Sequence, residues 1–174
     1  MHYYDDLQYE CNFWIQTFKY HVLILFWRFI NAGADVIITN TYKCNPGHVT
    51  RILEWPIEKS HELVKQTVQC AVTAAKESKK RIYIGGSIGP YSGELACPSG
   101  PYNPEYLKSL SIEQLAAWLE PLYQDLNSND DIDFLAIETV PGLKEAAAHF
   151  SLLMSKYRKN AYLGMVQYCF NLTE

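Results

Sequence analysis

The 174-residue chain is predicted to adopt an α/β fold, in which parallel strands alternate with helices. The first observation behind this prediction is a set of short apolar runs, rich in β-branched and aromatic residues, that suit strands buried on both faces. The second is that longer segments with the apolar spacing of helices separate these runs. The expected strands are residues 35–40, 82–88, 133–138 and 162–167.

Helices are expected over residues 57–79, 111–126 and 142–157, one in each crossover between strands. Ser111, which precedes Glu113 and Gln114, resembles a helix N-cap. Single-helix crossovers of this length predict right-handed βαβ units. A further helix is expected over residues 18–32, and no compact apolar run precedes it, so the predicted sheet begins with a helix.

Composition excludes several classes of protein. With 48% hydrophobic and 20% charged residues, the chain matches a single soluble domain. The net charge of −4 argues against nucleic-acid binding, which usually needs an excess of basic residues. The strongest apolar stretch, residues 22–27, is far shorter than the ~20 residues of a membrane span. The acidic N-terminus does not resemble a secretory signal, and the odd count of five cysteines has no CxxC pair, which together predict a cytoplasmic protein with reduced thiols.

Ligand sites of parallel α/β proteins gather where the strands end, which directs attention to the residues after each run. Asn40, Thr41 and Tyr42 follow the first strand with hydroxyl and amide groups suited to a small polar ligand, although ordinary turn chemistry explains them equally well. Residues 85–91, Gly-Gly-Ser-Ile-Gly-Pro-Tyr, permit close backbone approach but lack the patterns of a phosphate-binding or dinucleotide-binding loop.

Glu138 ends an otherwise apolar strand. Because carboxylates are seldom buried without a partner, we expect Glu138 to face a cationic ligand such as an α-amino group, or else to form a salt bridge with a neighbouring strand. The histidines do not fall at strand ends, so no Ser–His–Asp or Cys–His site is assembled and no catalytic residue is assigned.

Three motifs together resemble the homocysteine S-methyltransferase family in sequence, order and spacing. They are residues 32–42 (Ala-Gly-Ala-Asp-Val-Ile-Ile-Thr-Asn-Thr-Tyr), residues 85–91, and residues 133–141 (Asp-Phe-Leu-Ala-Ile-Glu-Thr-Val-Pro). The resemblance implies a TIM-type (β/α)8 barrel of which this chain carries strands two to five. It also implies a partial homocysteine-binding barrel domain over residues 18–174, after an atypical segment of residues 1–17.

The resemblance implies transfer of a methyl group from S-methylmethionine or S-adenosylmethionine to homocysteine, which gives methionine. Zinc is the implied cofactor: three cysteine thiolates hold the metal, which lowers the pKa of the substrate thiol. Glu138 matches the family's acid that binds the amino group of homocysteine. Asn40, Thr41 and Tyr42 match the strand exit that lines the same pocket.

This sequence departs from the family pattern at both ends. The family's opening Asp-Gly-Gly-Met-Gly-Thr motif has no counterpart before residue 18, and the zinc-binding cysteines of the family come from later strands, so no residue here is assigned to metal. We therefore expect a truncated family member that is inactive by itself. The alternatives are a non-catalytic homologue that binds an amino acid or pairs with a full-length paralogue, a homo-oligomer formed through exposed sheet edges, and an unrelated α/β domain.

Overall fold

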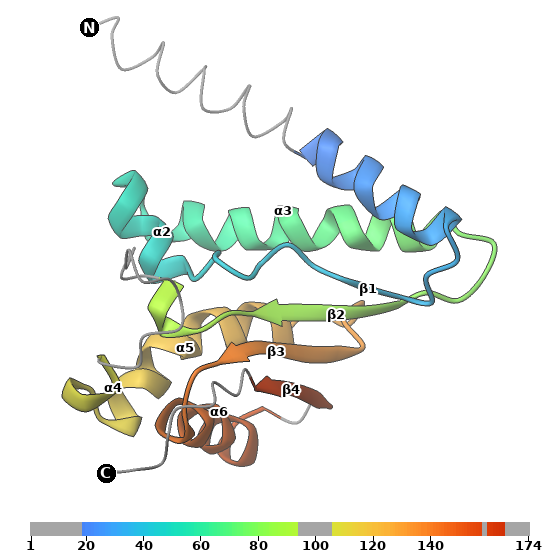
Figure 1. Ribbon diagram of the computed structural model, residues 1–174. Helices are drawn as coiled ribbons and strands as arrows, with labels where there is room; N and C mark the ends of the chain where they lie inside the picture. Colours follow the sequence, from blue (N-terminus) through green and yellow to red (C-terminus); the bar gives the residue numbers. More distant parts are fainter. Residues whose placement is uncertain (1–18, 94–105, 158–159, 166–174) are drawn as a thin grey trace, which may run out of the picture.

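The computed structural model describes residues 19–93, 106–157 and 160–165. Within these residues, four parallel strands form one sheet in the order β1-β2-β3-β4 (Figure 1). Each strand therefore pairs with the next one in sequence, which is the connectivity of a barrel wall. The strands are β1 (Val36–Ile38), β2 (Tyr83–Ile88), β3 (Phe134–Val140) and β4 (Ala161–Met165).

All four predicted strands are present, and the α/β fold class is confirmed: the described residues form a parallel sheet whose consecutive strand order is that of part of a (β/α)8 barrel. β1 is shorter than the predicted range 35–40. After Ile38, the backbone N–H of Ser87 in β2 donates to the side-chain Oγ1 of Thr39, so a side chain takes part in the pairing of the two segments. The end of the last predicted strand, residues 166–167, and the proposed boundary between residues 17 and 18 lie outside the described residues.

Helices cover the sheet on its outer side (Figure 1). Residues 19–31, drawn in blue, are helical and precede β1. One helix per crossover was expected, but the described chain has α2 and α3 between β1 and β2, and α4 and α5 between β2 and β3. The helices are α2 (Pro46–Leu53), α3 (Ile57–Lys76), α4 (Tyr106–Ser109), α5 (Ile112–Asn127) and α6 (Leu143–Ser155), with a 3-10 turn η1 (Tyr91–Gly93) after β2.

Local sequence explains where two of these helices begin. Ser111 caps α5: its hydroxyl accepts a hydrogen bond from the backbone N–H of Gln114, and the Gln114 side chain accepts one from the N–H of Ser111. The unexpected helix α2 begins after Asn45, whose Oδ1 accepts from the N–H of Gly47 at 3.0 Å and of His48 at 3.3 Å. No helix in the described part of the chain is long and apolar enough to cross a membrane.

Strand register separates two faces of the sheet. Ile37 pairs with Ile84, and both are buried against the helices. Val36 pairs with Tyr83, and these side chains point to the opposite, inner face, where they are 44% and 49% exposed. Tyr162, which pairs with Ala136 of β3, is 68% exposed. The inner face therefore carries apolar and aromatic side chains that no described helix covers.

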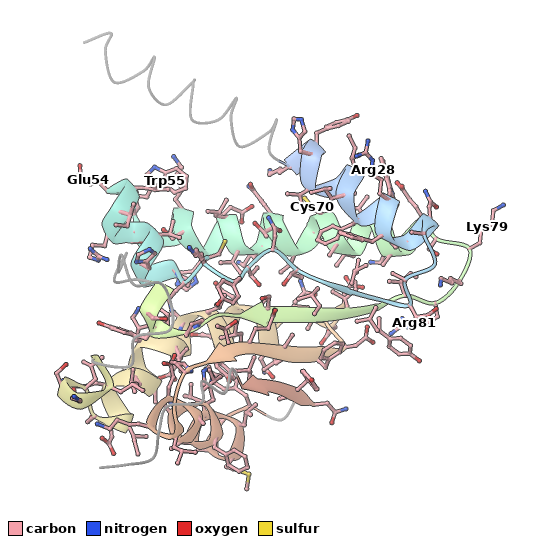
Figure 2. All side chains as sticks on the ribbon, viewed as in Figure 1. Arg28, Glu54, Trp55, Cys70, Lys79 and Arg81 are labelled. Atoms are coloured by element: carbon pink, nitrogen blue, oxygen red, sulfur yellow. The ribbon has the colours of Figure 1, made fainter. Side chains whose placement is uncertain are left out.

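Charged residues gather at the amino ends of the strands. Arg81, labelled in Figure 2, pairs with Asp133, and Lys80 pairs with Asp35 at 2.7 Å. Asp133 also accepts a hydrogen bond from the backbone N–H of Ile84 at 2.8 Å. These ion pairs tie the loops before β1, β2 and β3 together. In a barrel, this end contributes to stability, whereas ligands bind at the other end.

Candidate functional site

The carboxyl ends of β1, β2 and β3 meet at one edge of the sheet, on the left in Figure 1. Residues 39–42 leave β1 there, Gly89 and Pro90 leave β2, and Glu138 lies near the end of β3. Because the strands are parallel and adjacent, the fold brings together three segments that the sequence separates by about 50 residues each. We call residues 39–42, Ser87 and Glu138 the strand-exit site.

Ser87 links the strands on either side of it. Its hydroxyl donates to Glu138 Oε1 at 2.6 Å, and its side chain is buried whereas that of Glu138 is half-buried. Among the described residues, no cationic side chain forms a salt bridge with Glu138. β2 thus supplies Glu138 with a neutral hydrogen-bond donor, the Ser87 hydroxyl, and not with a positively charged partner.

The backbone of Ser87 is bonded to two threonines that follow β1. Its N–H donates to Thr39 Oγ1 at 2.9 Å, and its carbonyl accepts from Thr41 Oγ1 at 2.6 Å. The two threonine hydroxyls lie 2.8 Å apart. Since Thr41 has one hydroxyl proton and directs it to the Ser87 carbonyl, Thr39 must donate to Thr41. The three residues therefore form a closed ring in which each hydroxyl proton has an acceptor.

The predicted site residues differ in what they offer a ligand. Thr41 is fully buried and its hydroxyl proton is used within the ring, so it fixes the loop after β1. Asn40 Oδ1 is buried and has no hydrogen-bond partner among the described residues. Tyr42 packs against Gly89 so closely that a Cβ at Gly89 would lie 2.5 Å from the Tyr42 carbonyl oxygen. Glu138 is joined to Thr41 through Ser87.

The backbone beside Glu138 has an unusual conformation. Thr139 has φ = +60°, in the left-handed region that β-branched residues rarely adopt. The register of β3 against β4 shifts between Ile137 and Val140, which marks a β-bulge. Bulges redirect side chains, and strained residues of this kind cluster at ligand sites, so the bulge is a local reason for the position of the Glu138 carboxylate.

Sequence reasoning did not assign two polar residues that organise this edge. Ser87 lies inside the glycine-rich motif, where a single hydroxyl among glycine and isoleucine was the available signal. Glu145, in the first turn of α6, is fully buried and accepts a hydrogen bond from the backbone N–H of Tyr91 at 2.7 Å. It therefore anchors the segment that follows β2, and no sequence pattern links these two positions.

The described residues do not fit a zinc site. They include two cysteines, Cys44 and Cys70, and no group of three histidine, cysteine, aspartate or glutamate side chains that could hold a metal. Burial raises the pKa of Cys44 to about 11, and it also raises that of Cys70, which disfavours both thiolates.

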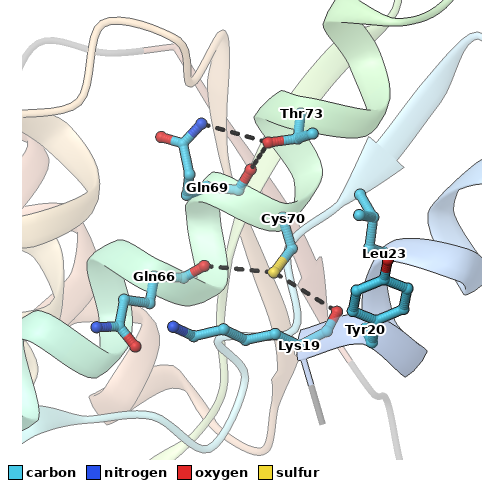
Figure 3. Close-up of a pocket in the computed structure, with 7 residues that line it drawn as sticks. All are labelled: Lys19, Tyr20, Leu23, Gln66, Gln69, Cys70 and Thr73. Carbon is cyan, nitrogen blue, oxygen red and sulfur yellow. Dashed lines mark hydrogen bonds between the residues drawn. The ribbon is translucent and has the colours of Figure 1, made fainter. Parts of the chain in front are cut away.

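Cys70 lies outside the barrel wall, between α3 and residues 19–31, where its Sγ is 3.4 Å from the Gln66 carbonyl oxygen (Figure 3). It is therefore remote from the strand-exit site. The other cysteines of the chain, Cys11, Cys97 and Cys169, lie outside the described residues.

Comparisons with known proteins agree with this fold. A betaine-homocysteine S-methyltransferase of Drosophila melanogaster is 33% identical over 138 residues, and the match covers 74% of this chain and 41% of that protein. Homocysteine S-methyltransferase 1 of Arabidopsis thaliana is 32% identical over 137 residues, covering 72% and 41%. The chain thus spans about 41% of the length of these relatives.

Solved structures give the same result. The metallated form of the homocysteine methyltransferase MmuM from Escherichia coli superposes with a TM-score of 0.71 at 28% identity, over 81% of this chain and 49% of that one. Its oxidized form gives a TM-score of 0.73 at 26% identity, over 87% and 53%. The family model described as homocysteine S-methyltransferase matches residues 6–173. With nearly all of its sequence inside that match, the chain belongs to the homocysteine S-methyltransferase family.

Proposed function

We propose that this chain binds homocysteine at the strand-exit site and is the substrate-binding part of a methyltransferase. The reaction is transfer of a methyl group from S-methylmethionine or S-adenosylmethionine to homocysteine, which gives methionine in the cytoplasm. The observation that carries this proposal is the half-buried Glu138 carboxylate at the carboxyl end of β3, which has no cationic partner among the described residues.

The geometry supports a particular mode of binding. Ser87 donates to Glu138 Oε1, while Oε2 has no partner among the described residues and can accept a hydrogen bond from the α-ammonium group of an amino acid. Asn40 Oδ1 at the same edge also has no described partner, but it is buried, so Glu138 and not Asn40 carries the proposed contact. In this account Thr41 holds the loop after β1 in place, and Tyr42 packs that loop against Gly89.

Methyl transfer itself needs more than the described residues provide. Zinc, when bound in the family, supplies a thiolate nucleophile by lowering the pKa of the homocysteine thiol. Because no described set of side chains suits zinc, we assign no step to the metal, and we propose that the chain alone does not catalyse the reaction. We also propose residues 18–174 as the binding domain, with residues 1–17 as a separate segment.

The proposal is tested by isothermal titration of the 174-residue chain with L-homocysteine under reducing conditions. A charge-assisted hydrogen bond contributes about 1.5–3 kcal/mol, so Glu138→Gln should weaken affinity by roughly 10- to 100-fold. Glu58→Gln, at an exposed position on α3, is the matched control and should bind like the wild type. Absence of binding by the wild type, or equal affinity of Glu138→Gln, would contradict the proposal.

A second candidate function is pairing with another copy of the chain, favoured by the exposed inner face of the sheet. The four described strands are half of an eight-stranded barrel. If β4 of each copy pairs with β1 of the other, residues 19–31 lie over the seam, and Tyr83 and Tyr162 become enclosed. Light scattering measures the mass of the species in solution. Pairing predicts twice the chain mass of 20.0 kDa, and a mass equal to that of one chain would contradict it.

A further inference from the structure

Ser87 is a buried hydroxyl in a stretch of strand that is otherwise glycine and isoleucine. Its partner in the register of β3 is Ala136, and its side chain reaches along the inner face to Glu138, two residues further on. It is 2% exposed, so a ligand in the strand-exit site can contact Glu138 but has almost no access to Ser87 itself. Any effect of Ser87 on a ligand must therefore pass through a neighbour.

The hydrogen bonds of Ser87 identify that neighbour as Glu138. The backbone N–H and carbonyl of Ser87 are both used by the threonine ring on the β1 side, which fixes the backbone of this residue against the loop after β1. The Ser87 hydroxyl has one proton, and its acceptor is Glu138 Oε1 on the β3 side. Because the backbone of Ser87 is held in place, its hydroxyl also holds Glu138 Oε1 in a fixed position.

We propose that Ser87 is a positioning residue that orients the Glu138 carboxylate for the ammonium group of the substrate. The proposal rests on the proposed function. The hydroxyl fixes Oε1 and leaves Oε2 directed to the ligand. The Glu138 side chain is therefore already ordered before the ligand arrives, and binding costs less side-chain entropy. The threonine ring supports this arrangement by holding Ser87, and no described cation performs the same role.

Substitution of Ser87 by alanine tests the idea. We expect Ser87→Ala to bind homocysteine about 10-fold more weakly, the loss of one hydrogen bond to a charged group. Ser87→Thr, which keeps the hydroxyl, should recover most of the affinity. The matched control is Ser60→Ala: Ser60 is also fully buried, and its hydroxyl lies 2.8 Å from Thr50 Oγ1, between α2 and α3. This control should leave affinity unchanged.

A double-mutant cycle separates positioning from general structural damage. If Ser87 acts through Glu138, then Ser87→Ala should weaken binding less than twofold in a Glu138→Gln background. A full 10-fold loss in that background, or a 10-fold loss caused by Ser60→Ala, would overturn the proposal. Unchanged affinity of Ser87→Ala in a wild-type background would overturn it as well.

A readout without ligand keeps this inference distinct from the proposed function. If the wild type fails to bind homocysteine, the proposed function fails, and carbon-13 NMR of the glutamate side chains then tests Ser87 directly. The Glu138 carboxyl resonance, identified by its loss in Glu138→Gln, should shift in Ser87→Ala and stay in place in Ser60→Ala. An identical resonance in the wild type and Ser87→Ala would show that the hydroxyl does not act on the carboxylate.

Discussion

His149 should make the folded chain sensitive to mild acid. It lies in α6 with 1% of its surface exposed, and its Nδ1 is 2.8 Å from the hydroxyl of Tyr123 in α5. Its other nitrogen, Nε2, is buried with no hydrogen-bond partner among the described residues. Protonation would put hydrogens on both nitrogens and leave a charged donor without an acceptor. Accordingly, burial lowers the pKa of His149 to about 3.

The sign and size of the effect follow from proton linkage. The ordinary pKa of a histidine is 6.5, so between this value and about 3 the unfolded chain binds a proton that the folded chain does not. The free energy of unfolding therefore falls as pH decreases, by about 1.4 kcal/mol per pH unit in this range. Lowering the pH from 7 to 5 should remove about 2 kcal/mol of stability through this residue alone.

Urea unfolding at pH 7, 6 and 5 measures this loss, and His149→Gln isolates it. Glutamine retains an acceptor for the Tyr123 hydroxyl but does not titrate, so the variant should lack the component of about 2 kcal/mol. His21→Gln, which removes an exposed histidine in the helix of residues 19–31, is the control and should retain it. Burial raises the pKa of Asp125, so this residue makes the opposite contribution, in which stability rises as pH falls; the wild type and His149→Gln both keep Asp125, and comparing them cancels that contribution. Equal pH dependence of the wild type and His149→Gln would refute the reasoning.

Two further substitutions test the backbone beside the strand-exit site. Gly89→Ala should lower the free energy of unfolding by about 1–3 kcal/mol, because its Cβ would lie 2.5 Å from the Tyr42 carbonyl oxygen. Gly47→Ala, with its nearest contact at 3.4 Å, is the control for urea unfolding, and equal losses would reject the packing argument. Thr139→Gly should instead raise stability by about 1 kcal/mol, since relief of strain at φ = +60° exceeds the entropy cost of glycine. A decrease on thermal unfolding would show that Thr139 is not strained.

The positions of the strands could be predicted from sequence because buried parallel strands read as uninterrupted apolar runs. The predicted range 82–88 contains β2 (Tyr83–Ile88), and the predicted range 133–138 overlaps all but the last two residues of β3 (Phe134–Val140). Helix α2 was missed for a local reason: it begins with Pro46-Gly47, a pair that favours turns, and it depends on the Asn45 side chain for its cap.

The site was only partly accessible to the same reasoning. A charge at the end of an apolar run identified Glu138, but the partner of Glu138 lies 51 residues away and is set by the register between β2 and β3. Thr41 presents the same difficulty, because nothing in the sequence shows that its hydroxyl points inward to Ser87. The positive φ of Thr139 has no sequence signal either, since threonine is a poor candidate for that conformation.

The most direct test of the central claim is an NMR titration that compares homocysteine with 4-sulfanylbutanoic acid, which has the same thiol and carboxylate but no amino group. If the Glu138 carboxylate recognises the ammonium group, homocysteine should shift the backbone amides of Asn40, Ser87 and Glu138 with a saturable response. The analogue should produce no comparable shift at Glu138. Equal shifts with both compounds, or homocysteine-dependent shifts confined to other parts of the chain, would contradict the account.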